Sequence, residues 1–388
     1  MFRGDFMSYL KDYIKNYGDT AFTAKGFTDA DNVAMCYMYY MPIEQVVSSS
    51  LDDEPVPFDK VCNELFELRG RKHTPVGLVL TKDISVQTMN MAAKKRYAQM
   101  KVVGATGVFG TSPAVQFNAA TFLLPDNTIV VLFRGTDDTL IGWKEDFDIL
   151  FKDSVPSNKL ATDYLEAVAQ KFSGDIIVCG HSKGGYVAQY GALNCKKEVR
   201  SRIVRLYNND GPGFQNYDFL NSEEYKEMLP KYRHFVPESS LIGMMLCHDD
   251  DYTVVKSKRV LGPLQHDLST WQFNGDKLRI TNDLSSLGKV NDLMMYNLVN
   301  NLNAEQSQAF DAVLTKLFCN DQYAGLLNFK NDFVGTVKTG KELADGIDSE
   351  TRKNFKSVIP NFKNAILSAE KDVYSGNFKT VKQRSESE

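Results

Sequence analysis

A serine with glycines on either side follows an apolar run in the segment Asp175-Ile-Ile-Val-Cys-Gly-His-Ser-Lys-Gly-Gly185. Residues 176–179 are continuously apolar, as in a fully covered parallel strand, and residues 186–193 suit a helix packed on it. Glycines around the serine permit a strained turn from strand to helix. We therefore predict that Ser182 stands exposed at this turn as a nucleophile, beside a helix N-terminus that can stabilise an oxyanion. An ordinary turn with a capping serine is the simpler alternative.

A serine hydroxyl is a weak nucleophile at neutral pH and needs a base, usually histidine. Three histidines follow the serine: His234, His248 and His266. His266 lies in a loop with glycine and proline, residues 262–271, where it can reach over the edge of a sheet. His234 falls inside a probable strand, and His248 lies in a charged turn where solvation is expected. These positions favour His266 as the base.

The acid that orients the base is less clearly marked. Asp210 follows the apolar run 203–207 in a glycine-rich loop, at the carboxyl end of the strand expected after the nucleophile. The alternative is the acidic run Asp249, Asp250 and Asp251, which is nearer His266 in sequence but typical of a solvated turn. Asp267 is adjacent to the histidine and poorly placed to face the same ring. We favour Asp210, and the run at 249–251 remains open.

An oxyanion hole requires two hydrogen-bond donors. The residue after the nucleophile, Lys183, supplies one through its backbone N–H. The second donor is expected from a loop after an earlier strand. Residues 133–137 fit this position, because they begin at the end of the apolar run 129–133. Gly135 in this loop permits close approach of the backbone, and Thr136 offers both an N–H and a hydroxyl. We therefore assign the second donor to Thr136.

The surrounding pattern predicts an α/β protein. Residues 115–124 and 129–133 are β-like runs joined by a short turn, which predicts a hairpin. Strand-like and helical segments then alternate between residues 160 and 207, which is typical of a mostly parallel sheet with helices on both faces. We expect an N-terminal helical region at 1–105 packed on a core at 106–289, then a C-terminal helical extension at 290–388. Residues 379–388 of the extension are expected to be a frayed polar tail.

Composition excludes several classes of protein. The net charge is −4, with no global attraction to nucleic acid. Six cysteines without metal-type or disulfide-type spacing predict reduced thiols in a cytoplasmic protein, and we expect neither a metal nor a cofactor. The N-terminal ten residues lack the sustained apolar core of a signal peptide. No apolar stretch approaches 18 residues, so we expect no transmembrane span, although the helical flanks are compatible with peripheral membrane contact.

These motifs resemble those of α/β hydrolases in the class 3 lipase group. Phe133-Arg-Gly-Thr136 followed by Trp143-Lys-Glu-Asp146 is similar to the lipase oxyanion segment, and residues 180–185 are similar to its Gly-His-Ser-x-Gly-Gly turn. Residues 180–185, 209–213 and 265–271 together resemble, more closely still, a bacterial branch of lipase-like hydrolases without an assigned function. The resemblance implies the α/β-hydrolase fold, with Ser182 as nucleophile, His266 as base and Thr136 as oxyanion donor.

The sequence departs from the lipase pattern at two positions. Lys183 replaces a residue that is usually small or apolar, so a preference for apolar acyl chains does not transfer. The lipase acid normally stands two residues before a Val-Pro pair. In this chain the pair is Val236-Pro237, and the position two residues before it is occupied by His234 in place of an acid. The primary hypothesis is a serine hydrolase that cleaves a small-molecule or lipid carboxylic ester through an acyl-enzyme. The alternative is a non-catalytic binding or scaffold protein that retains the fold.

Overall fold

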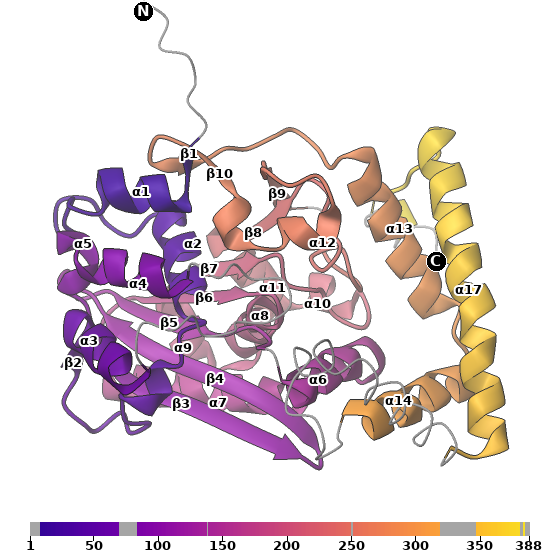
Figure 1. Ribbon diagram of the computed structural model, residues 1–388, viewed down its shortest axis with the longest axis horizontal. Helices are drawn as coiled ribbons and strands as arrows, with labels where there is room; N and C mark the ends of the chain where they lie inside the picture. The colour runs from indigo at the N-terminus through magenta and orange to yellow at the C-terminus, as the bar shows by residue number, and fades with distance from the viewer. Residues whose placement is uncertain are drawn as a thin grey trace, which may run out of the picture.

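A computed structural model describes residues 8–69, 84–137, 139–249, 251–318, 347–380 and 383–384 (Figure 1). An eight-stranded sheet runs through the centre of the molecule in the order β2-β3-β4-β5-β6-β7-β8-β9. A small second sheet has the order β1-β10-β11.

The elements have the following bounds. The strands are β1 (Ser8–Tyr9), β2 (Val56–Pro57), β3 (Lys101–Thr111), β4 (Ala114–Leu123), β5 (Ile129–Phe133), β6 (Ile176–His181), β7 (Ile203–Asn209), β8 (Tyr232–Pro237), β9 (Tyr252–Val255), β10 (Gln272–Asn274) and β11 (Lys277–Leu278). The helices before β6 are α1 (Leu10–Tyr17), α2 (Asp29–Met38), α3 (Phe58–Arg69), α4 (Ile84–Ala92), α5 (Lys95–Ala98), α6 (Leu140–Phe151) and α7 (Pro156–Lys171). Those after it are α8 (Lys183–Asn194), α9 (Lys197–Arg202), α10 (Asp218–Asn221), α11 (Glu223–Met228), α12 (Gly262–Gln265), α13 (Ser286–Asn300), α14 (Ala304–Phe318) and α17 (Ser349–Tyr374). Short 3-10 helices are η1 (Ile43–Gln45), η2 (Leu229–Lys231) and η3 (Leu268–Thr270).

The central sheet is mostly parallel. Strands β5 to β9 pair in parallel, each with the next, while β2 to β5 pair antiparallel at the other end. The hairpin of β4 and β5 confirms the sequence prediction for residues 115–133. Parallel strands place their carboxyl ends at one edge of the sheet, so the loops after β5, β6, β7 and β8 meet there. This edge positions the residues discussed below.

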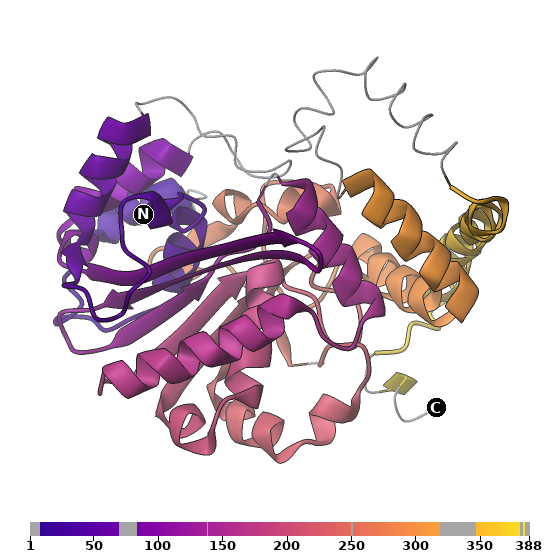
Figure 2. The same cartoon turned by 90° about the horizontal axis from the view of Figure 1, so that it is seen from below.

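Helices cover both faces of the sheet, because successive side chains of a strand point to opposite faces. In β5, Val130 and Leu132 pack in one core with the N-terminal helices α2, α3 and α4. Val131 and Phe133 point the other way and pack in a second core with α6, α7 and α8. Figure 2 shows the strands between these two helical layers. The expected α/β architecture with helices on both faces is confirmed at this level.

Strand β3 was not anticipated from the sequence. The N-terminal helical region expected at residues 1–105 ends earlier, since residues 101–111 pair with β4 as a long strand. Val102 and Val103 are buried, but glycines at 104, 107 and 110 interrupt the apolar alternation that would have marked the strand.

The C-terminal helices α13, α14 and α17 lie together at one side of the core (Figure 1). A cluster of buried residues joins α13 to α17, and Phe310 of α14 packs its ring 6.0 Å from Phe147 and 5.4 Å from Phe151 of α6. Arg384, in the segment expected to be a polar tail, is buried and pairs with Asp292 of α13 at 2.7 Å. Of the C-terminal helices, α14 therefore packs on α6, which also forms part of the site.

Candidate active site

Ser182 stands at the turn between β6 and α8, as the sequence predicts. Its backbone has φ 58° and ψ −133°, in a region that residues with a side chain rarely adopt. The turn is so tight that a Cβ on Gly180 would lie 1.9 Å from the carbonyl oxygen of Gly184. A Cβ on Gly184 would lie 2.2 Å from the carbonyl oxygen of Phe133. Only glycine fits at these two positions, and the first turn of α8 therefore packs against the end of β5.

His266 and Asp210 form a buried pair beside this turn. The Nδ1 atom of His266 lies 2.7 Å from Oδ2 of Asp210. Asp210 follows β7 and His266 follows α12, so the pair joins two loops at the same edge of the sheet. The two residues favoured from the sequence as base and acid are thus in contact.

The carboxylate of Asp210 is held in place by further bonds. Its Oδ1 accepts hydrogen bonds from the hydroxyl of Ser240 at 2.5 Å and from the N–H of Gly243 at 3.1 Å. Its own backbone has φ 51°, a second left-handed conformation in the site. A buried carboxylate needs such donors, because an unpaired charge away from water is costly. The remaining oxygen is directed at His266.

The other acidic and basic residues considered from the sequence lie elsewhere. Burial lowers the pKa of His234, within β8, to about 3. The prediction that His248 is solvated is wrong, because the residue is buried. Burial lowers the pKa of its ring, but the nearby Asp292 carboxylate raises it, and the net effect is a raised pKa. Asp249 is also buried, which raises its pKa to about 6, and its carboxylate accepts from the N–H of Asp251 at 2.9 Å. Asp250 lies outside the described residues.

The predicted oxyanion donors flank Ser182. Lys183 begins α8, where backbone N–H groups have no partner within the helix. The hydroxyl of Thr136 donates to Asp146 of α6, at 2.7 Å from Oδ1 and 2.6 Å from Oδ2. Burial raises the pKa of Asp146 to about 6, against the opposing effects of the Lys183 ammonium and the Thr136 hydroxyl. The hydroxyl of Thr136 is therefore engaged by Asp146, and its backbone N–H is the group that can face an oxyanion.

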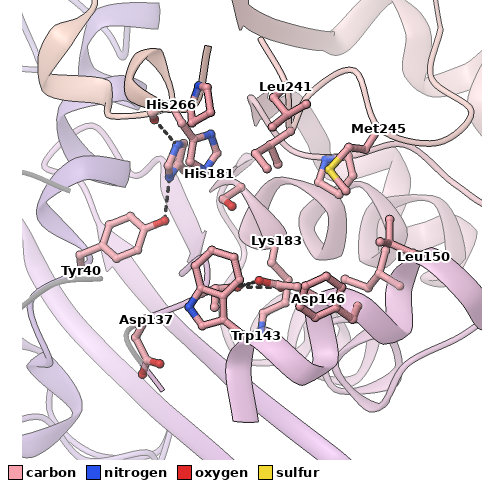
Figure 3. Close-up of a pocket in the computed structure, with 17 residues that line it drawn as sticks. Tyr40, Asp137, Trp143, Asp146, Leu150, His181, Lys183, Leu241, Met245 and His266 are labelled. Atoms are coloured by element: carbon pink, nitrogen blue, oxygen red, sulfur yellow. Dashed lines mark hydrogen bonds between the residues drawn. The ribbon is translucent and has the colours of Figure 1, made fainter. Parts of the chain in front are cut away.

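Tyr40 and His181 complete the site on the side of the N-terminal helices. Burial holds the pKa of His181 well below its usual range, so its ring is neutral. Its Nε2 lies 2.9 Å from the carbonyl oxygen of His266 and must donate, so Nδ1 accepts from the Tyr40 hydroxyl at 2.7 Å (Figure 3). The sequence carried no signal for Tyr40, which lies 141 residues from its partner. Through His181 it supports the backbone that carries the His266 ring.

A mostly apolar cavity of about 300 Å³ opens beside these residues. Its polar lining includes Ser182, His266 and Thr136. Its apolar lining is Trp143, Phe147, Ile149, Leu150, Pro212, Leu241, Ile242, Met245 and Pro263. Figure 3 shows the side chains of His181 and His266 at one side of this space and those of Trp143 and Asp146 at another. No hydrogen bond joins Ser182 to the His266 ring in the described structure, and such bonds are often long until a substrate is bound.

In the described parts of the chain, no group of three or more histidine, cysteine, aspartate or glutamate side chains is arranged to hold a metal ion. The described helices also include none that is both long and apolar enough to cross a bilayer.

The fold and site define an α/β protein with a mostly parallel sheet, whose carboxyl edge gathers a serine, a histidine and an aspartate. The chain belongs to the Mbeg1-like family, whose sequence model matches residues 91–316. The family is lipase-like. No curated protein matches the chain. Among solved structures, the chain is similar to the lipase–propeptide complex of Rhizomucor miehei, at 16% identity, covering 69% of this chain and 77% of that one, with a TM-score of 0.34.

Proposed function

We propose that the protein is a serine hydrolase of the α/β-hydrolase fold, which cleaves a carboxylic ester through an acyl-enzyme. The observation that carries the proposal is the 2.7 Å contact of His266 with Asp210 in a cavity that Ser182 also lines. The chain order of serine, aspartate and histidine is the order of that fold. The buried pair faces the cavity, which is where a base and the acid that orients it would have to act.

The residues have the following proposed roles. Ser182 Oγ attacks the ester carbonyl carbon while His266 Nε2 takes its proton. Asp210 holds the proton on Nδ1, which leaves Nε2 free to accept, and stabilises the imidazolium. The N–H groups of Lys183 and Thr136 stabilise the oxyanion, and His266 then protonates the leaving alcohol. Water, activated by the same histidine, attacks the acyl-enzyme and releases the carboxylic acid.

The shape and lining of the cavity indicate the substrate class. Nine of its lining side chains are apolar, including Trp143 and Leu150 of α6 and Met245 of the loop after β8. Such a lining favours an ester with an apolar acyl group, either a small-molecule or a lipid ester. The thiols of Cys36, Cys62, Cys179 and Cys195 are free, which supports a reducing compartment, so we place the enzyme in the cytoplasm.

Labelling with a fluorophosphonate tests the proposal, because only an activated serine reacts readily. We expect the wild-type protein to be labelled and to hydrolyse p-nitrophenyl esters, and Ser182→Ala to do neither. Ser201→Ala, at an exposed serine of α9, is the matched control and should behave as wild type. A wild-type protein that resists labelling, or equal labelling of Ser182→Ala, would favour a binding or scaffold protein instead.

A further inference from the structure

The side chain of Lys183 is almost completely buried below the turn that carries Ser182. Its ammonium donates to the carbonyl oxygen of Gln116 at 2.7 Å, to Oε1 of the same residue at 2.7 Å, and to Oε2 of Glu145 at 3.0 Å. The side chains of Lys183 and Glu145 are 2% and 0% exposed. In Figure 3 the Lys183 side chain points away from His266, toward the opposite wall of the cavity.

Glu145 connects the lysine to three other elements. Its Oε2 also accepts from the N–H of Gln116 in β4 at 2.9 Å. Its Oε1 accepts from the N–H of Ser157 at 3.1 Å and from the Ser157 hydroxyl at 2.6 Å, at the start of α7. Lys183 thus ties the first residue of α8 to β4, α6 and α7 through one buried carboxylate.

The same connection spans the two halves of the predicted oxyanion hole. Lys183 itself carries one backbone N–H donor. Glu145 precedes Asp146 on α6, and Asp146 holds the hydroxyl of Thr136, which carries the other donor. A change in how α6 sits against α8 would therefore change the separation of the two N–H groups.

We propose that Lys183 is a positioning residue, whose buried ammonium clamps the turn of Ser182 to α6 and so sets the geometry of the two oxyanion donors. This inference rests on the proposed function. It gives a physical role to the lysine that stands where related lipases carry a small or apolar residue.

Stability alone does not explain a buried lysine at this position. Removing two charges from water is unfavourable, and replacing a buried ion pair by apolar residues of similar volume is often neutral or stabilising. An apolar side chain would fill the space without that cost, but it would not hold Gln116 and Glu145 together. What the ion pair adds is a fixed geometry and a positive charge near the oxyanion hole.

The ammonium also acts on Asp146. Burial raises the pKa of this carboxyl, and the nearby charge of Lys183 opposes the rise more than any other group does. The other charged or titratable groups that act on it are Glu145, which raises its pKa, and His266, which lowers it. Loss of the lysine charge would move the protonation of Asp146 to higher pH.

Two variants separate positioning from packing. Lys183→Met removes the ammonium at similar length but leaves the Glu145 carboxylate buried without its cation, so a lower Tm is expected. Lys183→Met combined with Glu145→Gln removes that unpaired charge, and its Tm should return toward wild type. If the single variant does not fold, the double variant carries the test.

We expect the double variant to keep a kcat at least about tenfold below wild type with little change in KM, because the donors lose their fixed spacing. In the single variant, the acid limb of the pH profile of kcat should move to higher pH, and in the double variant it should return part of the way. The matched control is Arg384→Met with Asp292→Asn, which removes another buried ion pair, outside α6 and the turn. Its kcat should remain within about twofold of wild type.

Recovery of both Tm and kcat in the double variant would overturn the inference, because the lysine would then matter only for folding. A wild-type kcat in Lys183→Met would overturn it as well. A wild-type protein without esterase activity or fluorophosphonate labelling would instead contradict the proposed function itself.

Discussion

Nδ1 of His266 lies 2.7 Å from Oδ2 of Asp210, and the two residues are 56 positions apart in the sequence. If Asp210 orients the imidazole, Asp210→Asn should lower kcat by about 100-fold or more with little change in KM, since the amide favours the wrong tautomer. Steady-state hydrolysis of a p-nitrophenyl ester measures both constants. The control is the triple change of Asp249, Asp250 and Asp251 to asparagine, which should have a small effect; the opposite ranking would move the acid to that run.

The histidines provide a second test. His266→Ala should be as inactive as Ser182→Ala, because without its base the serine cannot lose its proton. His234→Ala should retain activity, since this ring lies within β8 and does not line the cavity. Initial rates at saturating ester, with circular dichroism to confirm folding, measure the effect. An inactive but folded His234→Ala would transfer the role of base to that residue.

The backbone of Ser182 predicts a trade between stability and activity. Its φ of 58° costs a residue with a Cβ about 1–3 kcal/mol, whereas glycine adopts this region freely. Ser182→Gly should therefore be more stable than Ser182→Ala by about 1 kcal/mol, after allowing for the greater chain entropy of glycine, and both should be inactive. Urea unfolding at equilibrium compares the two. Equal stabilities would mean that the turn is not strained.

Adjacent tyrosines offer a matched pair for the bond to His181. Tyr40→Phe removes the hydroxyl that donates to Nδ1 of His181, so a buried acceptor loses its partner at a cost of about 1–3 kcal/mol. We also expect a lower kcat, because His181 supports the backbone of His266. Tyr39→Phe is the control: the Tyr39 hydroxyl is buried without a hydrogen-bond partner among the described residues, so its loss should be neutral or stabilising. Chemical denaturation and ester hydrolysis compare the stability and activity of the two variants. Equal effects of Tyr40→Phe and Tyr39→Phe would contradict the role of Tyr40.

The raised pKa of Asp146 predicts how stability changes with pH. The folded pKa of about 6 exceeds the ordinary value of 3.8, so the folded protein binds the proton more tightly. The stability from this group is present below pH 4 and is lost as pH rises through 6. Because each pKa unit corresponds to about 1.4 kcal/mol, a rise from 3.8 to about 6 predicts a loss of about 3 kcal/mol in the free energy of unfolding. The Asp146→Asn variant has no titrating group at this position and should not show this loss. Its free energy of unfolding relative to wild type should therefore increase from pH 4 to pH 7. A difference independent of pH would contradict the buried, titrating carboxyl.

Local sequence was enough to predict the turn at Ser182, because a strand, the glycines at 180 and 184, and a helix are consecutive in the chain. The hairpin of β4 and β5 and the parallel strands that follow were predictable for the same reason, since apolar runs and turns are short-range signals. His266 could be favoured from its loop alone. The long strand β3 could not, because its glycines hide the alternation of apolar residues.

Only the tertiary structure could show that Asp210, and not the run at 249–251, contacts the ring of His266, because this contact depends on which loop reaches the ring. Tyr40 and Glu145 belong to segments far from Ser182 in sequence, and nothing in their local pattern distinguishes them from ordinary core residues. The sheet brings these segments together, since the carboxyl ends of its parallel strands share one edge. Short motifs therefore indicated the proposed chemistry of the site, whereas the contact of His266 with Asp210 and the contacts that support it depend on how distant loops and helices pack.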